Sequence, residues 1–150
     1  MNIEIIKAEK KHQKSIIDFQ IKMAFETEGI HLEREILEEG VQAVFKDPNL
    51  AQYYIAHIDG QTIASLMITF EWSDWRNKKV WWIQSVYVVE EYRRKGVFSL
   101  FYEFIKEKAA LLEEVGGIRL YVDKTNHAAQ NTYNKMGMNG EHYQLFEWMK

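Results

Sequence analysis

Residues Val80 to Ile105 form a strand, a basic turn and a helix in succession, and this stretch constrains the fold more than any other part of the chain. Residues 80–89 are apolar on both faces, which is typical of an interior strand that is covered on both sides. Gln84 and Ser85 interrupt this run with two polar side chains, so a bulge is expected there. From Gly96 onward, apolar residues recur at roughly the helical period. The sequence therefore predicts a central strand that leads through a short turn into an amphipathic helix.

The turn between this strand and this helix places positive charge beside backbone amides. Arg93, Arg94 and Lys95 precede Gly96, where the first helical amides have no intrahelical acceptor. Unpaired amides, the positive end of the helix dipole and fixed cations together favour an anion such as phosphate. Gly96 has no side chain, so a ligand could approach the backbone closely. A basic turn that merely joins a strand to a helix is the alternative interpretation.

The composition indicates a folded protein and excludes several kinds of site. The chain has 150 residues, of which 47% are hydrophobic, so we expect one globular domain, residues 1–150. The formal net charge of −3 lacks the basic excess of nucleic-acid binders, and no apolar run reaches the ~20 residues that span a bilayer. The absence of Cys excludes disulfides, thiolate metal sites and a cysteine nucleophile. We expect a cytoplasmic protein without nucleic-acid or membrane partners, and a homodimer is left open.

Periodicity and stop signals predict the remaining elements. Before the central strand, the patterns predict strands at 3–8, 51–58 and 62–70 and helices at 10–25 and 32–46. Asp59-Gly60 joins two of these strands as a hairpin signal. After the central helix, the patterns predict a strand at 118–122, a helix at 126–136 and a last strand at 143–149.

Two segments resemble the signatures of the GNAT superfamily of acetyl-CoA-dependent N-acetyltransferases. The pyrophosphate loop of that superfamily has Arg or Gln, two residues, Gly, any residue and then Gly or Ala. Here it reads Arg93-Arg94-Lys95-Gly96-Val97-Phe98, with Phe98 in place of a small residue. The other signature has Asn, then Ala three on, Tyr seven on and Gly eleven on, and all four positions match: Asn126, Ala129, Tyr133 and Gly137.

The resemblance implies a fold and an activity. The implied fold is a three-layer α+β arrangement, in which about four helices flank a mixed, mostly antiparallel sheet of about six or seven strands. The implied activity is transfer of an acetyl group from acetyl-CoA to a primary amine of a small molecule or peptide. Because there is no Cys, direct attack of the amine on the thioester is the simplest path. A domain that binds acyl-CoA without transferring it is the alternative, and a nucleic-acid module is disfavoured by the charge balance.

The resemblance also assigns residues to the cofactor. Backbone groups along Val86, Tyr87 and Val88 would pair with the pantetheine arm. Asn126 would contact the cofactor, and Tyr133 would bind it and protonate the departing sulfur, because the reference pKa of a phenol, about 10, is not far from that of a thiol. Asn126 as a simple N-cap and Tyr133 as a packing residue are the alternatives. The pyrophosphate would be held by Arg93, Arg94, Lys95, Gly96, Val97, Phe98 and Ser99.

The acceptor amine is expected at the end of the central strand opposite the cofactor. Segments 25–29 and 71–75 mix carboxylates with aromatic rings, which is chemistry that attracts a cation, although solvated loops are the alternative. Glu28, or a water that it holds, is the hypothesised base; Glu26, Glu71, Asp74, Asp123 or water alone are the alternatives. No metal is expected, because His31 and Glu35 lack a third ligand at matching spacing. The expected acceptor-binding residues are Glu26, Glu28, Glu71, Trp75, Trp82 and Gln84.

Overall fold

The computed structural model describes all 150 residues, which form two compact units, Met1–Arg119 and Leu120–Lys150. The first unit contains the strands β1 (Glu4–Lys7), β2 (Gln52–Ile58), β3 (Gln61–Ser73), β4 (Lys78–Val88) and β5 (Val115–Arg119). It also contains the helices α1 (Gln13–Glu28), α2 (Arg34–Lys46) and α3 (Val97–Leu111), and the short 3-10 helices η1 (Lys10–His12) and η2 (Glu90–Tyr92). The second unit contains α4 (His127–Lys135). None of the helices has the length and apolar character needed to cross a bilayer.

The five strands form one sheet in the order β1-β2-β3-β4-β5. Neighbouring strands are antiparallel, except that β4 and β5 run parallel. The α+β class and the mixed, mostly antiparallel sheet therefore agree with the fold that the resemblance implied. The number of strands is five, which is fewer than the six or seven expected.

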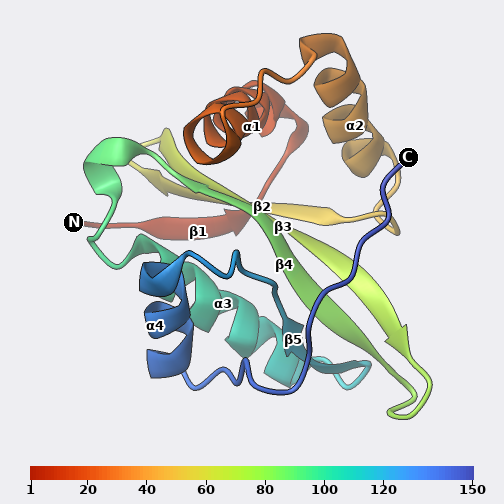
Figure 1. Cartoon of the computed structure of the whole chain (residues 1–150). Helices are drawn as coiled ribbons and strands as arrows, with labels where there is room; N and C mark the ends of the chain where they lie inside the picture. Colours follow the sequence, from red (N-terminus) through yellow and green to blue (C-terminus); the bar gives the residue numbers. More distant parts are fainter. The chain divides into compact units, whose positions relative to one another are not determined.

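Helices cover both faces of the sheet in the first unit, which gives it three layers (Figure 1). On one face, Ile16 of α1 and Val41 of α2 share a buried cluster with Tyr53 of β2. On the other face, the Phe104 ring of α3 meets the Tyr54 ring edge-on, with centroids 5.8 Å apart. Successive residues of a strand point to opposite faces. Because helices cover both faces of the sheet, the central strand is apolar on both of its sides.

Two predicted turns are confirmed by their backbone conformation. Gly29 ends α1 with a φ of 65°, in the left-handed region that glycine adopts readily. Asp59 and Gly60 have φ values of 48° and 80° between β2 and β3. Positive φ at both positions is what a two-residue type I′ hairpin requires.

The predicted last strand is wrong. Residues 143–149 carry aromatic and aliphatic side chains that favour strands, yet they have no regular secondary structure, and Phe146 is 87% exposed. The sheet consists of β1 to β5 alone. The strand predicted at 118–122 also forms earlier, at Val115–Arg119.

Candidate active site

The turn between β4 and α3 has a backbone that only certain residues tolerate. Arg94 has a φ of 58°, and Gly96, the N-cap of α3, has a φ of 79°. A Cβ built on Gly96 would meet no atom within 4 Å, so the glycine is required by its conformation and not by crowding. The space in front of it is open to a ligand. The start of the turn is anchored to the sheet, because the Val89 amide donates to the Ile63 carbonyl at 2.9 Å.

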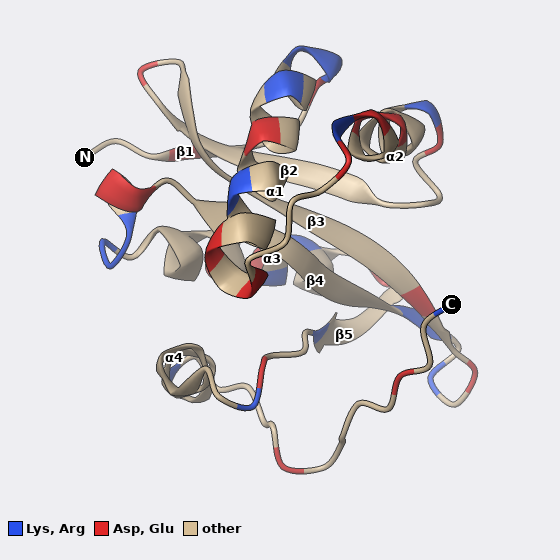
Figure 2. Cartoon of the chain, turned by 45° about the horizontal axis from the view of Figure 1, so that its top comes forward, with Lys and Arg blue, Asp and Glu red and all other residues tan.

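The three cations of this turn do different things. Arg93 points back at the protein: its Nη2 lies 2.6 Å from Glu26 Oε2, and its Nε donates to the Val88 carbonyl at 2.8 Å. Arg94 and Lys95 take part in no ion pair, although Lys95 Nζ lies 5.5 Å from the centre of the Tyr92 ring. Figure 2 shows the acidic η2 followed at once by this basic turn. The charges of Arg94 and Lys95 therefore remain available for an anion.

Glu26 belongs to the turn and not to the expected acceptor end. Its carboxylate accepts hydrogen bonds from Arg93 and, at 3.3 Å, from the Tyr87 hydroxyl. The hydrogen bond to Glu26 raises the pKa of the Arg93 guanidinium above its ordinary value. Burial and, after it, the negative charge of Glu26 raise the pKa of the Tyr87 phenol. Glu71, in contrast, lies opposite Val80 near the start of β4. Strand spacing separates Val80 from Tyr87 by on the order of 20 Å. The sequence analysis expected segments 25–29 and 71–75 to border the same end of the central strand, whereas Glu26 and Glu71 lie near opposite ends of β4.

Glu28 lies at the exposed end of α1. It is eight residues beyond Gln20, whose side chain touches Ser85 of β4. A helix rises 1.5 Å per residue, so Glu28 is displaced by about 12 Å along α1 from that contact. A role for Glu28 at the centre of β4 would therefore need a relay of waters.

The predicted bulge lies in the middle of β4. Met67 of β3 pairs with Gln84, and Ser65 pairs with Tyr87, so two β4 residues oppose one residue of β3. Ser85 has a φ of 55°, and its carbonyl accepts a hydrogen bond from the buried Gln20 side chain at 3.1 Å. A bulge turns backbone groups out of the ladder, and α1 holds this one in place.

β4 and β5 separate beyond the first few residues of their pairing. The paired stretch runs only from Lys79 to Trp82 on β4 and from Val115 to Arg119 on β5. From Ile83 onward, the edge of β4 that faces β5 has no partner strand, and this edge includes Val86 and Val88. Its backbone groups can pair with an extended ligand that leads toward the turn before α3.

Polar side chains gather on the α1 face of the sheet, between the bulge and the β3–β4 turn. Thr69 pairs with Trp82 across β3 and β4, and the Gln84 side-chain amide donates to the Thr69 hydroxyl. Arg119 of β5 reaches across β4 to form an ion pair with Glu71. This polar face, defined by Thr69, Glu71, Trp82, Gln84 and Arg119, contains three of the residues that the sequence analysis expected to bind the acceptor. Trp75 is not among them, because it is 92% exposed in the β3–β4 turn.

The second unit contains the other sequence signature. Asn126 is the N-cap of α4, and its side-chain oxygen accepts from the Ala129 amide at 3.1 Å. Partial burial raises the pKa of the Tyr133 phenol above its usual value, so the group stays protonated to higher pH. Thr125 donates to Asp123 from both its amide and its hydroxyl, which lowers the pKa of that carboxyl.

Sequence reasoning missed the roles of Gln20, Thr69 and Arg119. Gln20 had a detectable signal, because a polar residue stands four positions after Ile16 on the apolar face of α1. Arg119 had none, because its partner Glu71 is 48 residues away in the chain.

Comparison with known proteins gives consistent matches. The model of the acetyltransferase (GNAT) family matches residues 14–138. A possible acetyltransferase from Clostridium difficile 630 is 39% identical, with a TM-score of 0.92 over 100% of this chain and 99% of that one. No curated protein sequence matches the chain.

Two more distant structures share the fold. Glucosamine-6-phosphate N-acetyltransferase from Arabidopsis thaliana is 17% identical, with a TM-score of 0.75 over 100% of both chains. A predicted acetyltransferase from Clostridium acetobutylicum, whose structure is described with acetyl-CoA, is 19% identical, with a TM-score of 0.74 over 97% of this chain and 96% of that one.

Proposed function

The chain belongs to the GNAT family of acetyltransferases, and we propose that it transfers an acetyl group from acetyl-CoA directly to a primary amine of a small molecule or peptide. The observation that carries this proposal is the junction of β4 and α3, where an unpaired strand edge runs into a basic turn at a helix N-terminus. The acetyl-CoA described with the Clostridium acetobutylicum relative supports the donor. The N-acetyltransferase from Arabidopsis supports an amine acceptor.

The residues of the turn fit the pyrophosphate of acetyl-CoA. Arg94 and Lys95 carry charges that no carboxylate neutralises, and Gly96 leaves open space before the first turn of α3. The amides of that first turn have no intrahelical acceptor and lie at the positive end of the helix dipole. Val97 is buried at the start of α3, and Phe98 and Ser99 follow it. Arg93 contributes through the position of the loop, since its guanidinium is held by Glu26.

The bulge is proposed to hold the reacting carbonyl. Acetyl-CoA, when bound, supplies the acetyl group as an activated thioester. Backbone amides around Ser85 would stabilise the oxyanion that forms as the amine attacks, because donors turned out of the ladder are already in place. Gln20 keeps the Ser85 carbonyl turned toward α1. The nitrogen–carbon bond forms, the carbon–sulfur bond breaks, and no enzyme nucleophile intervenes, in keeping with the absence of Cys.

Two proton transfers complete the reaction. We assign protonation of the departing thiolate to Tyr133, whose raised pKa keeps the phenol in its proton-donating form. The proton of the attacking amine goes to water, with Glu28 as a base that acts through water because of its distance along α1. Asn126 is assigned to the cofactor through the side-chain NH₂ that its capping bond leaves available.

The polar face defined above is the proposed site of the amine. The Trp82 ring offers an aromatic surface for a cation, and the Gln84 side chain lies beside the bulge. The ion pair between Glu71 and Arg119 offers both a negative and a positive group, so it can orient an acceptor that carries polar substituents.

Acetyl-CoA-dependent release of thiol over a panel of amines tests the proposal. We expect release that depends on a primary amine and is matched by acetylated product. Binding of acetyl-CoA without amine-dependent release for any member of the panel would identify an acyl-CoA-binding domain instead.

A further inference from the structure

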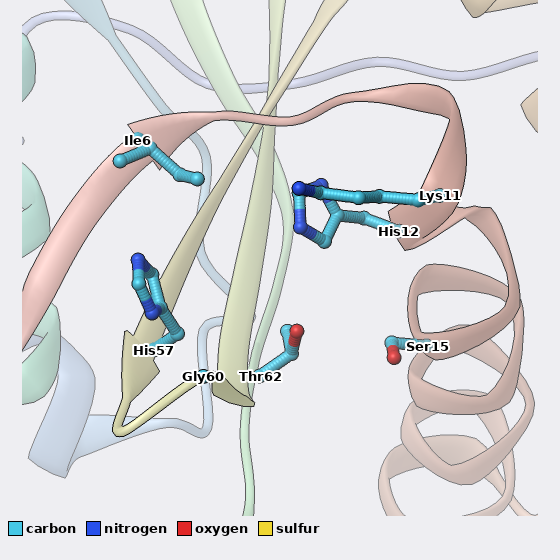
Figure 3. Close-up of a pocket in the computed structure, with 7 residues that line it drawn as sticks. All are labelled: Ile6, Lys11, His12, Ser15, His57, Gly60 and Thr62. Atoms are coloured by element: carbon cyan, nitrogen blue, oxygen red, sulfur yellow. The ribbon is translucent and has the colours of Figure 1, made fainter.

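A cavity of about 470 Å³ lies between the beginning of α1 and the β2–β3 turn (Figure 3). Ile6 forms its apolar side and packs against the core cluster under α1 and α2. The cavity therefore lies on the α1 face of the sheet, whereas the basic turn leads into α3 on the opposite face. Nothing in the proposed acetyl transfer uses this cavity.

The polar side chains that line the cavity can all donate hydrogen bonds, and none is acidic. They come from η1, α1, β2 and β3, and Figure 3 shows them around one space: Lys11, His12, Ser15, His57 and Thr62. His12 Nδ1 accepts from the Glu9 amide at 2.9 Å, so the proton of the neutral ring is on Nε2, which then acts as a donor. The two imidazoles lack the third ligand that a metal site would need.

The groups that line the cavity beside His12 include positive charges but no carboxylate. Burial, then the charge of Lys11 and, to a smaller extent, that of His57 lower the pKa of His12, while Glu9 opposes them. Glu9 lies 3.8 Å from Lys11 Nζ, and Glu4 lies 3.4 Å from His57 Nε2, but neither carboxylate lines the cavity. An anion placed among these groups would relieve the repulsion between them.

We propose that this cavity binds a small oxyanion of the phosphate class, either inorganic phosphate or a phosphate monoester, through Lys11, His12 and His57, with Ser15 and Thr62 as further donors. Its volume lies within the roughly 300–1,000 Å³ of small-molecule sites. Protonated imidazoles bind phosphate more tightly than neutral ones, whereas protonation of the phosphate dianion in the same pH range opposes binding. Glu4 and Glu9 limit the first effect, because each already neutralises part of the positive charge.

The test follows the imidazole resonances of all five histidines by NMR, without acetyl-CoA, while inorganic phosphate is titrated at constant ionic strength with chloride. Phosphate should shift the imidazole resonances of His12 and His57, and the resonances of His31, His127 and His142 serve as internal controls. A second titration with glycerol phosphate distinguishes the two sources: tighter binding of glycerol phosphate than of phosphate identifies a monoester, and weaker binding identifies the free ion.

Two variants make the test specific. Lys11→Met should weaken phosphate binding about tenfold, the loss expected for a charged hydrogen bond, and Thr62→Val should weaken it less. Lys14→Met is the matched control, since Lys14 is an exposed lysine of α1 that does not line the cavity. Equal changes in the imidazole resonances of all five histidines, or identical affinities for the Lys11→Met and Lys14→Met variants, would overturn the proposal. Neither result bears on acetyl transfer.

Discussion

Arg93 Nη2 lies 2.6 Å from Glu26 Oε2, and this ion pair ties the end of α1 to the turn that precedes α3. The Tyr87 hydroxyl donates to the same carboxylate, and the Arg93 guanidinium lies 5.3 Å from the centre of the Tyr87 ring. One carboxylate therefore fixes both the last buried residue of β4 and the first residue of the basic turn. Glu26 acts as a positioning residue for the loop.

Glu26→Gln should raise the KM for acetyl-CoA about two- to fivefold with little change in kcat. The ion pair is partly exposed, and such pairs contribute about 0.2–1 kcal/mol. Steady-state kinetics with the best amine measure both constants. Glu28→Gln is the matched control for the loop, since Glu28 forms no ion pair. This variant should leave the KM for acetyl-CoA unchanged and raise the KM for the amine. An unchanged KM for acetyl-CoA in Glu26→Gln would show that the loop does not need this contact.

Gln20→Leu should reduce both stability and turnover, because the Ser85 carbonyl loses its donor and the bulge loses its link to α1. We expect a loss of about 1–2 kcal/mol in the free energy of unfolding. Urea unfolding and kcat are the measurements. Gln13→Leu, also in α1 but without a side-chain hydrogen bond, provides the comparison. Equal turnover in the two variants would mean that the bulge keeps its shape without Gln20.

Gly96→Ala should destabilise the protein by about 1–2 kcal/mol, the cost of placing an ordinary residue in the left-handed region, and should weaken binding of CoA. Gly40→Ala is the matched control. Gly40 lies within α2 and also has open space where a Cβ would be, so alanine should stabilise it by roughly 0.5–1 kcal/mol. Calorimetry for CoA and urea unfolding measure the two effects. The same change in stability at both glycines would contradict the conformational argument.

Tyr133→Phe should lower kcat by roughly 10²-fold, within the range for a lost general acid, while CoA affinity is nearly kept. Because burial raises the pKa of the phenol, the wild-type enzyme should lose its acid only at a higher pH than an ordinary phenol would. A pH–rate profile, measured where chemistry limits turnover, should show this alkaline limb and its absence in the variant. If the Tyr133→Phe variant keeps wild-type turnover, Tyr133 is a packing residue and not the general acid.

Local signals made part of this structure predictable. The hairpin at Asp59-Gly60, the end of α1 at Gly29 and the bulge beside Ser85 each follow from a few neighbouring residues. The residues of the basic turn were also predictable, because strand, cations and glycine are contiguous in the sequence.

Contacts between distant residues were not predictable. Arg93 and Glu26 are 67 residues apart, and Gln20 and Ser85 are 65 apart, so no periodicity relates them. The same limit explains why Glu26 was assigned to the acceptor. Its position beside acidic and aromatic neighbours in sequence says nothing of the arginine that folding brings to it.

The most direct measurement of the central claim uses isotopically labelled acetyl-CoA with the best amine and follows the acetylated amine by mass spectrometry beside released thiol. We expect one molecule of labelled acetylated amine for each molecule of thiol released. Changing Arg94 and Lys95 to Glu should abolish both the labelled product and the thiol release, because the turn then repels the pyrophosphate. The Lys10→Glu and Lys14→Glu double variant, with the same change in charge in η1 and α1, should retain activity. Thiol release without labelled amine, or full activity in the Arg94 and Lys95 variant, would contradict the account.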